Sequence, residues 1–194
     1  MDEHYATMSA YTETWPKPHR LTVDDYYRMA EVGVLSPDDR TELIEGEIID
    51  MAPIGSVHAD VVRLLTKRLV TAFGDTAELS VQLPVGLSQR SEPQPDIAVL
   101  AAKAARYRHA HPSAADVLLL IEVSDTTLRY DLKVKARLYA THGVQEYWVV
   151  DLVANRVWRH RRPSGTHYSE ITEITAGTIE LPGVVGEIVV AEIF

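Results

Sequence analysis

Short apolar runs and helix-spaced apolar positions alternate along the first 150 residues of the chain. The most apolar run, DVLLLIEV at 116–123, predicts a central strand that is covered on both faces. DIAVLA at 96–101 and QEYWVVD at 145–151 have the same character and predict two further buried strands. We therefore expect the centre of a sheet between residues 96 and 151.

Two helices are predicted before this sheet. Thr22 can cap a helix that extends to Val32, because the acidic residues after it suit the positive N-terminal end of a helix. Apolar residues at helical spacing predict a longer helix over 57–73, with Ser56 as its cap. Between the two helices, TELIEGEIIDM at 41–51 alternates and breaks at a glycine, which predicts two short strands joined by a tight turn.

A third helix is predicted over RYDLKVKARLYATHG at 129–143. Asp131, Lys135 and Tyr139 are four residues apart in it and are expected on one face. After residue 150 the predicted strands follow one another without helices. This order predicts an α/β fold of the mixed, α+β kind, in which a mixed sheet is flanked by helices and further antiparallel strands lie at the C-terminal end.

Composition and length favour one globular domain. The chain has 194 residues, and we expect a single domain over 21–194, preceded by an N-terminal arm over residues 1–20 that is mobile or packs on a partner subunit. No apolar run approaches the length of about 18 residues that a transmembrane helix needs, so no membrane partner is expected. The sequence contains no cysteine, which excludes disulfides and thiolate metal sites and agrees with a cytoplasmic location.

The charge of the chain argues against one class of function. A net charge of -9 disfavours a protein that coats nucleic acid through bulk positive charge. It leaves room for a nuclease, because a bound metal ion can supply positive charge among carboxylates.

Two carboxylates stand at informative places in the predicted sheet. Asp96 opens one buried strand, and Glu122 ends the most apolar one. Taken singly, Asp96 is a common turn residue after a proline, and Glu122 can mark a strand that emerges into solvent. Taken together, they mark the same end region of two strands, where two carboxylates repel each other unless a proton or a divalent cation lies between them. Oxygen ligands of this kind suit Mg²⁺ or Mn²⁺.

Lys135 has two interpretations. With Asp131 it can form a surface ion pair worth about 0.3–0.5 kcal/mol. Tyr139 on the same face is large for a stripe that only meets solvent, which favours a face directed toward the strand ends. A lysine near two carboxylates and a metal ion is typical of a phosphate-hydrolysing site.

Several segments of the sequence resemble the Uma-two family, which belongs to the PD-(D/E)XK nuclease-like superfamily. These segments are PD at 95–96, IEV at 121–123, the D…K…Y set at 131, 135 and 139, GVQEYWVVD at 143–151 and ELIEGEIIDMAPIGSVH at 42–58. The resemblance covers about residues 20–194, with the blocks in the same order. It implies a restriction-endonuclease-like fold.

The resemblance also implies roles for individual residues. Asp96 and Glu122 match the metal-binding acids, and the backbone carbonyl of Val123 completes the metal shell. Lys135 matches the family's helix lysine. One position departs from the superfamily pattern, which places lysine two residues after the second acid, where this chain has Ser124.

Four further residues are expected to support the site: Glu42, His58, Asp131 and Tyr139. Glu42 matches an acid of the family that can hold a second metal or an ordered water, although a charge at a strand edge is an alternative. His58 matches a loop histidine, with a helix cap or a surface position as alternatives. Tyr139 is expected to orient Lys135 or Asp131.

The resemblance points to an endonuclease that hydrolyses DNA phosphodiester bonds with Mg²⁺ or Mn²⁺. A homodimer suits the cutting of two strands. The serine at position 124 and the acidic charge keep a second interpretation open, a nuclease-fold protein for binding or assembly with weak or no catalysis. A third is the hydrolysis of a phosphorylated small molecule at the same site.

Overall fold

The computed structural model describes residues 16–36, 38–103 and 106–194. Its centre is a six-stranded mixed sheet with the strand order β3-β4-β5-β6-β7-β8. Only the pair β5–β6 is parallel, and the other neighbours are antiparallel. The six strands are β3 (Ala77–Val81), β4 (Ile97–Ala101), β5 (Val117–Ser124), β6 (Glu146–Asp151), β7 (Arg156–Ser164) and β8 (His167–Ile174).

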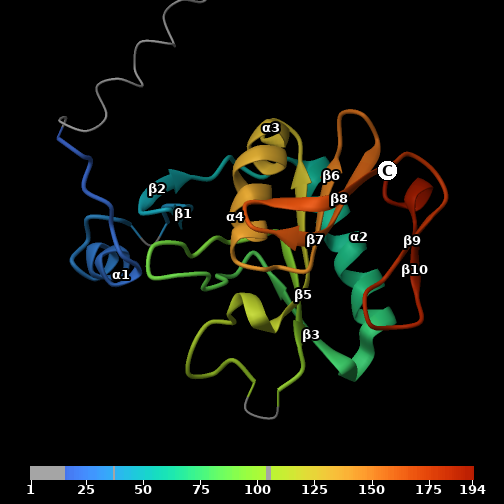
Figure 1. The fold of residues 1–194 in the computed structure, drawn as a ribbon, viewed down its shortest axis with the longest axis horizontal. Coiled ribbons are helices and arrows are strands. Elements are labelled where there is room, and N and C mark those ends of the chain that lie inside the picture. The colour runs from blue at the N-terminus through green and yellow to red at the C-terminus, as the bar shows by residue number, and fades with distance from the viewer. Residues whose placement is uncertain (1–15, 37, 104–105) are drawn as a thin grey trace, which may run out of the picture.

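Helices cover both faces of this sheet (Figure 1). The long helix α2 (Ser56–Phe73) packs on one face through its apolar residues, together with the C-terminal pair β9 (Thr178–Glu180) and β10 (Glu187–Val189). The opposite face is covered by a helical segment of α3 (Leu128–Tyr130), the π-helical turn η4 (Asp131–Lys135) and α4 (Ala136–Thr141). Three short 3-10 turns complete the elements, η2 (Gly74–Thr76), η3 (Ala114–Asp116) and η5 (Val190–Glu192).

Alternation along the strands explains how one sheet serves two cores. In β5, Leu119 and Ile121 join the cluster under α2, while Leu120 joins the cluster under α4. Side chains of successive strand residues point to opposite faces, so a continuous apolar run is needed for a sheet that is covered on both sides. The prediction of DVLLLIEV as a central buried strand is confirmed, as is the predicted mixed sheet flanked by helices.

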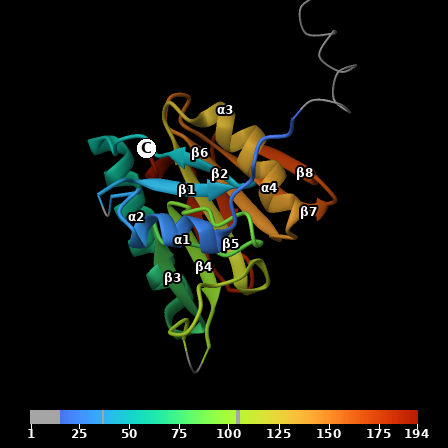
Figure 2. The same ribbon diagram turned by 90° about the vertical axis from the view of Figure 1, so that its left-hand side faces the viewer.

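The N-terminal elements form a separate layer, which faces the viewer in Figure 2. Helix α1 (Val23–Glu31) begins with a capping box between Thr22 and Asp25, which agrees with the predicted cap. β1 (Thr41–Ile44) and β2 (Glu47–Asp50) pair as a hairpin. Glu45 and Gly46 both have positive φ, as a tight two-residue turn requires.

The structure corrects two details of the predicted helices. Ser56 is the first helical residue of α2 and not its cap, since the N-cap is Gly55 and no side chain caps this end. The third helix is not regular, because its stretch from Asp131 to Lys135 is π-helical.

Two further expectations concern the N-terminal arm and membrane-spanning helices. The arm predicted over residues 1–20 falls mostly on residues 1–15, outside the described residues. No helix within the described ranges is both long enough and apolar enough to cross a membrane.

Candidate active site

The register of the central strands brings the two predicted acids to one place. Ile97 of β4 pairs with Ile121 of β5 in antiparallel register, so residue 96 lies beside residue 122 at the same end of the two strands. Asp96 and Glu122 are 6% and 5% exposed. Both carboxyl groups are therefore withdrawn from solvent, where each needs a partner.

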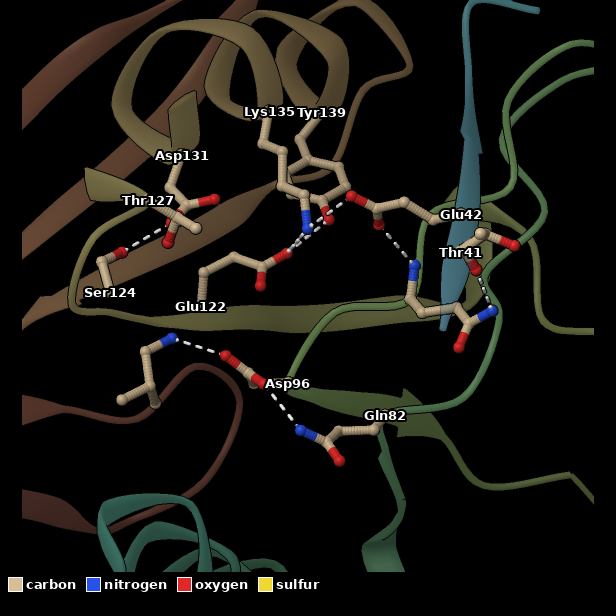
Figure 3. Close-up of polar contacts among 12 residues, drawn as sticks. Thr41, Glu42, Gln82, Asp96, Glu122, Ser124, Thr127, Asp131, Lys135 and Tyr139 are labelled. Carbon is tan, nitrogen blue, oxygen red and sulfur yellow. Dashed lines mark hydrogen bonds and ion pairs between the residues drawn. The ribbon is translucent and has the colours of Figure 1, made fainter. Parts of the chain in front are cut away.

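Glu122 has its partners on the helical segment above it (Figure 3). Lys135 Nζ lies 2.9 Å from Glu122 Oε1, and the Tyr139 hydroxyl donates to the same oxygen at 2.9 Å. Tyr139 was expected to orient Lys135 or Asp131, but its hydroxyl contacts Glu122 instead. The other Glu122 oxygen points away from Lys135, toward the side of the strand where Asp96 lies.

A third acid enters from the hairpin. Glu42 on β1 is 3% exposed, and its Oε1 lies 3.1 Å from Lys135 Nζ. Its second oxygen accepts a hydrogen bond from the Gln94 backbone amide at 3.0 Å. The alternative of a strand-edge charge is wrong for Glu42, which is buried and ion-paired.

Asp96 is held by three donors. Its Oδ2 accepts the Val123 backbone N–H at 2.9 Å and lies 3.0 Å from His58 Nε2. Its Oδ1 accepts from the Gln82 side-chain amide at 3.0 Å. His58 stands in the first turn of α2, and its side chain is directed at this acid rather than at solvent or the helix end.

Asp131 does not pair with Lys135. Its Oδ2 accepts hydrogen bonds from the hydroxyls of Ser124 at 2.8 Å and Thr127 at 2.6 Å. The interpretation of Asp131 and Lys135 as a surface ion pair is therefore wrong, since both are buried and each has other partners.

Asp96, Glu122, Asp131 and Lys135 have shifted pKa values. Burial raises the pKa of Glu122 well above its usual range, and Lys135 offsets this only in part. Burial also raises the pKa of Asp131, despite Lys135 and the two hydroxyls. Burial alone would lower the pKa of Lys135, but the carboxylates of Glu122, Glu42 and Asp131 outweigh it and raise the value. Lys135 therefore stays charged in a cluster with an excess of acids.

Asp96 behaves differently from Glu122. Burial would raise its pKa, but the hydrogen bonds from His58, Gln82 and the Val123 amide outweigh burial and lower it. The hydrogen bond to Asp96 in turn raises the pKa of His58. The site thus combines an acid that stays ionised with one, Glu122, whose ionised form needs more positive charge nearby.

These side chains line a pocket of about 540 Å³. Its floor holds Glu42, Asp96, Glu122, Asp131 and Lys135. The other lining residues come from the end of the hairpin and the start of α2 on one side, and from the segment after β5 on the other: Arg40, Ile49, Asp50, Met51, Ala52, Pro53, Ile54, Gly55, His58, Gln82, Val123, Asp125, Thr126, Thr127 and Tyr130.

The donor set at the floor suits a hard divalent cation. Asp96 and Glu122 offer carboxylate oxygens, Val123 after Glu122 also lines the pocket, and one lysine stands against four buried acids. No group of three or more His, Asp or Glu side chains among the described residues forms a ready-made cage. An ion at this place would therefore share its shell between few protein oxygens and water, as Mg²⁺ commonly does.

Two contributors were not predicted from the sequence. Gln82 has a positive φ of 52°, which turns the chain after β3 and lets its amide reach Asp96. Gln94 fixes Glu42 through its backbone N–H. The sequence signal for both was weak, because Gln94 stands between two prolines and Gln82 two residues before one, and glutamine near proline is common in ordinary loops.

Comparisons with known proteins agree with the fold. The model of the Uma2 family, described as "Putative restriction endonuclease", matches residues 23–187. Among curated proteins, none matches this chain. A crystal structure of a putative nuclease belonging to DUF820 from Anabaena variabilis superposes with a TM-score of 0.72 at 16% identity, covering 90% of this chain and 97% of that one. The type IIG restriction endonuclease BpuSI is matched at 18% identity over 74% of this chain and 16% of that one, and its TM-score of 0.39 is too low to indicate a common fold.

Proposed function

The chain belongs to the Uma2 family, and we propose that it is a divalent-metal-dependent endonuclease that hydrolyses DNA phosphodiester bonds. The observation that supports this most is the excess of buried acid over buried base in one pocket. Glu42, Asp96, Glu122 and Asp131 are all at most 6% exposed, and Lys135, which pairs with Glu42 and Glu122, is the one buried lysine among the described residues. Such an excess is costly unless a cation relieves it.

The residues at the ends of β4 and β5 are proposed to hold the metal ion. Asp96, Glu122 and the Val123 carbonyl would hold Mg²⁺ or Mn²⁺. When bound, the ion would polarise the phosphate and lower the pKa of a coordinated water. His58 and Gln82 keep the Asp96 carboxylate in one orientation.

Lys135 would stabilise negative charge that develops on the phosphate. Its ammonium group is held by Glu42 and Glu122 at the floor of the pocket, and it remains protonated there. Tyr139 positions Glu122, and Ser124 with Thr127 anchors Asp131 at the start of the π turn. The lysine thus comes from the helical segment, while the strand position used by the superfamily carries a serine that supports this segment.

Hydrolysis of DNA by purified protein tests the proposal. Supercoiled plasmid and single-stranded circular DNA are incubated with Mg²⁺ or Mn²⁺, comparing the wild type with Asp96→Asn and Glu122→Gln. We expect each substitution to lower the rate at least about 100-fold. Asp60→Asn, which changes an exposed carboxylate on α2, is the matched control. Undiminished cleavage by both site variants would overturn the assignment.

One observation favours a second candidate, a nuclease-fold protein that binds or assembles without catalysis. Lys135 is already paired with two carboxylates, and Asp96 with His58. These charged groups therefore have partners within the protein. Calorimetry with Mn²⁺ at neutral pH separates the two candidates, because absence of binding would favour the second. Hydrolysis of a phosphorylated small molecule at the same pocket is tested by a phosphatase substrate panel.

Location and assembly complete the proposal. We place the protein in the cytoplasm, in keeping with its cysteine-free sequence. We propose a homodimer, which would bring two such sites to one DNA molecule. Light scattering at micromolar concentration tests the dimer, and a monomer mass would exclude it.

A further inference from the structure

The reactive groups of the pocket lie at its floor rather than on an open surface. Asp96, Glu122 and Lys135 are 6%, 5% and 5% exposed, below an opening formed by the hairpin end and the segment after β5. Intact duplex DNA is stiff, and its phosphates lie on the outside of a broad helix. A phosphate of an intact duplex therefore has poor access to groups buried this deeply, whereas a flexible strand can enter.

One wall of the pocket is apolar. It is formed by Ile49 and by the continuous stretch Met51–Gly55, in which Ile54 is 42% exposed. An unpaired base has an apolar face that packs on such a wall, and a base inside a duplex has that face covered by its neighbours. The wall and the acidic floor thus offer separate places for a base and for its phosphate.

The charge around the opening of the pocket also favours a single strand over a duplex. Asp50 and Asp125 are exposed and line the pocket. Apart from Lys135, Arg40 is the one basic residue of the lysine or arginine type among the described lining residues. Duplex DNA carries one negative charge per about 1.7 Å of its axis, and a single strand carries about half of that. An acidic rim with a single arginine disfavours the duplex more strongly.

We infer that the pocket takes an unpaired DNA nucleotide, from a single strand or an unpaired region, in preference to intact duplex. The base packs against Met51, Pro53 and Ile54, its phosphate is directed to the floor, and Arg40 contacts a flanking phosphate at the rim. Arg40 is held for this by a hydrogen bond of 3.2 Å from its Nη1 to the Ala52 carbonyl. The inference rests on the proposed function, because it names the substrate class of the same site.

Hydrolysis of three matched substrates tests the preference. The same end-labelled sequence is offered as a single strand, as a fully paired duplex, and as a duplex with a central unpaired stretch. Because opening a base pair costs free energy, we expect the single strand and the unpaired stretch to be cut at least about tenfold faster than the duplex. Equal or faster cutting of the paired duplex would overturn the inference while leaving the proposed nuclease function intact.

A binding measurement without metal keeps the two proposals apart. Fluorescence anisotropy with the labelled single strand compares the wild type, Ile54→Ser and the control Val70→Ser. Val70 is an apolar residue of α2 that is 51% exposed and does not line the pocket. We expect Ile54→Ser to raise Kd at least about threefold and Val70→Ser to leave it unchanged. Tighter binding of the duplex than of the single strand would overturn the inference, and so would equal Kd values for the wild type and Ile54→Ser. These results decide the inference even if no substrate is hydrolysed. A lack of hydrolysis would count against the proposed function alone.

Discussion

Lys135 Nζ lies 2.9 Å from Glu122 Oε1, and the lysine reaches this acid from the helical segment above the sheet. The strand position two residues after this acid carries Ser124, whose hydroxyl donates to Asp131 at the start of the π turn. The ammonium group therefore reaches the acid from the helical segment and not from the strand, and the serine stabilises the element that carries the lysine.

Removing the lysine should destabilise the protein and inactivate it. Lys135→Met leaves Glu42 and Glu122 buried without their cation, and breaking a buried ion pair on one side costs about 3–5 kcal/mol. Urea denaturation would measure this loss of unfolding free energy. The double variant Lys135→Met with Glu122→Gln should recover part of the stability but no hydrolysis, because one uncompensated charge is removed and the chemistry is not restored. A double variant no more stable than Lys135→Met would contradict the ion-pair assignment.

Ser124→Ala should have a smaller and purely structural effect. It removes one of two hydroxyl donors to Asp131, at a position with no solvent exposure, and should lower the free energy of unfolding by about 1 kcal/mol. Ser169→Ala, which removes an exposed hydroxyl bonded to a backbone carbonyl, is the matched control and should change stability by less than about 0.5 kcal/mol. Equal effects of the two substitutions would show that Ser124 does not anchor the π turn.

Mn²⁺ should stabilise the folded wild type. A ligand that binds only the folded state adds about 2.7 kcal/mol at a concentration of about 100 times its Kd. Thermal unfolding of the wild type should therefore shift upward with added Mn²⁺ and return on chelation. Asp96→Asn should show a much smaller shift, and Asp60→Asn the full one. Equal shifts for the wild type and Asp96→Asn would place the metal elsewhere.

Individual strands were predictable where one physical requirement dominated. A run such as VLLLI fits only an element buried on both faces, and Glu45 with Gly46 between alternating segments fits only a tight hairpin turn. Asp96 and Glu122 could be placed at one end of the sheet from the strand pattern. The two acids are neighbours because β4 and β5 pair in antiparallel register, and no local feature of the sequence predicts that pairing.

The details of the helical segment were not predictable in the same way. A π turn has no clear residue preference, so the pattern Asp131, Lys135 and Tyr139 was assigned to one α-helical face. Whether Lys135 pairs with Asp131 or with Glu42 and Glu122 depends on how the hairpin packs against the helical segment. Contacts of this kind join residues far apart in the chain, and local periodicity carries no information about them.

His160 on β7 should make the stability of the fold depend on pH in a mildly acidic range. It is 2% exposed, packs between the rings of Tyr147 and Tyr168, and its Nδ1 has no hydrogen-bond partner in the described structure. Burial lowers its pKa below the usual 6.5. Above pH 6.5 the imidazole is neutral in both states. As pH falls below this value the unfolded chain takes up the proton first, so the free energy of unfolding falls by at most about 1.4 kcal/mol per pH unit until the folded-state pKa is reached.

Replacing this histidine should flatten the dependence. His160→Phe keeps an aromatic ring in the cluster and cannot be protonated, so its unfolding free energy should fall less between pH 7 and pH 5 than that of the wild type. His167→Phe, at an exposed position of β8, is the matched control and should keep the wild-type slope. Urea denaturation at four pH values across this range gives the three slopes. Parallel slopes for the wild type and His160→Phe would mean that His160 is protonated as easily in the folded protein as in the unfolded chain, and that its burial between the two tyrosines has no effect on its charge.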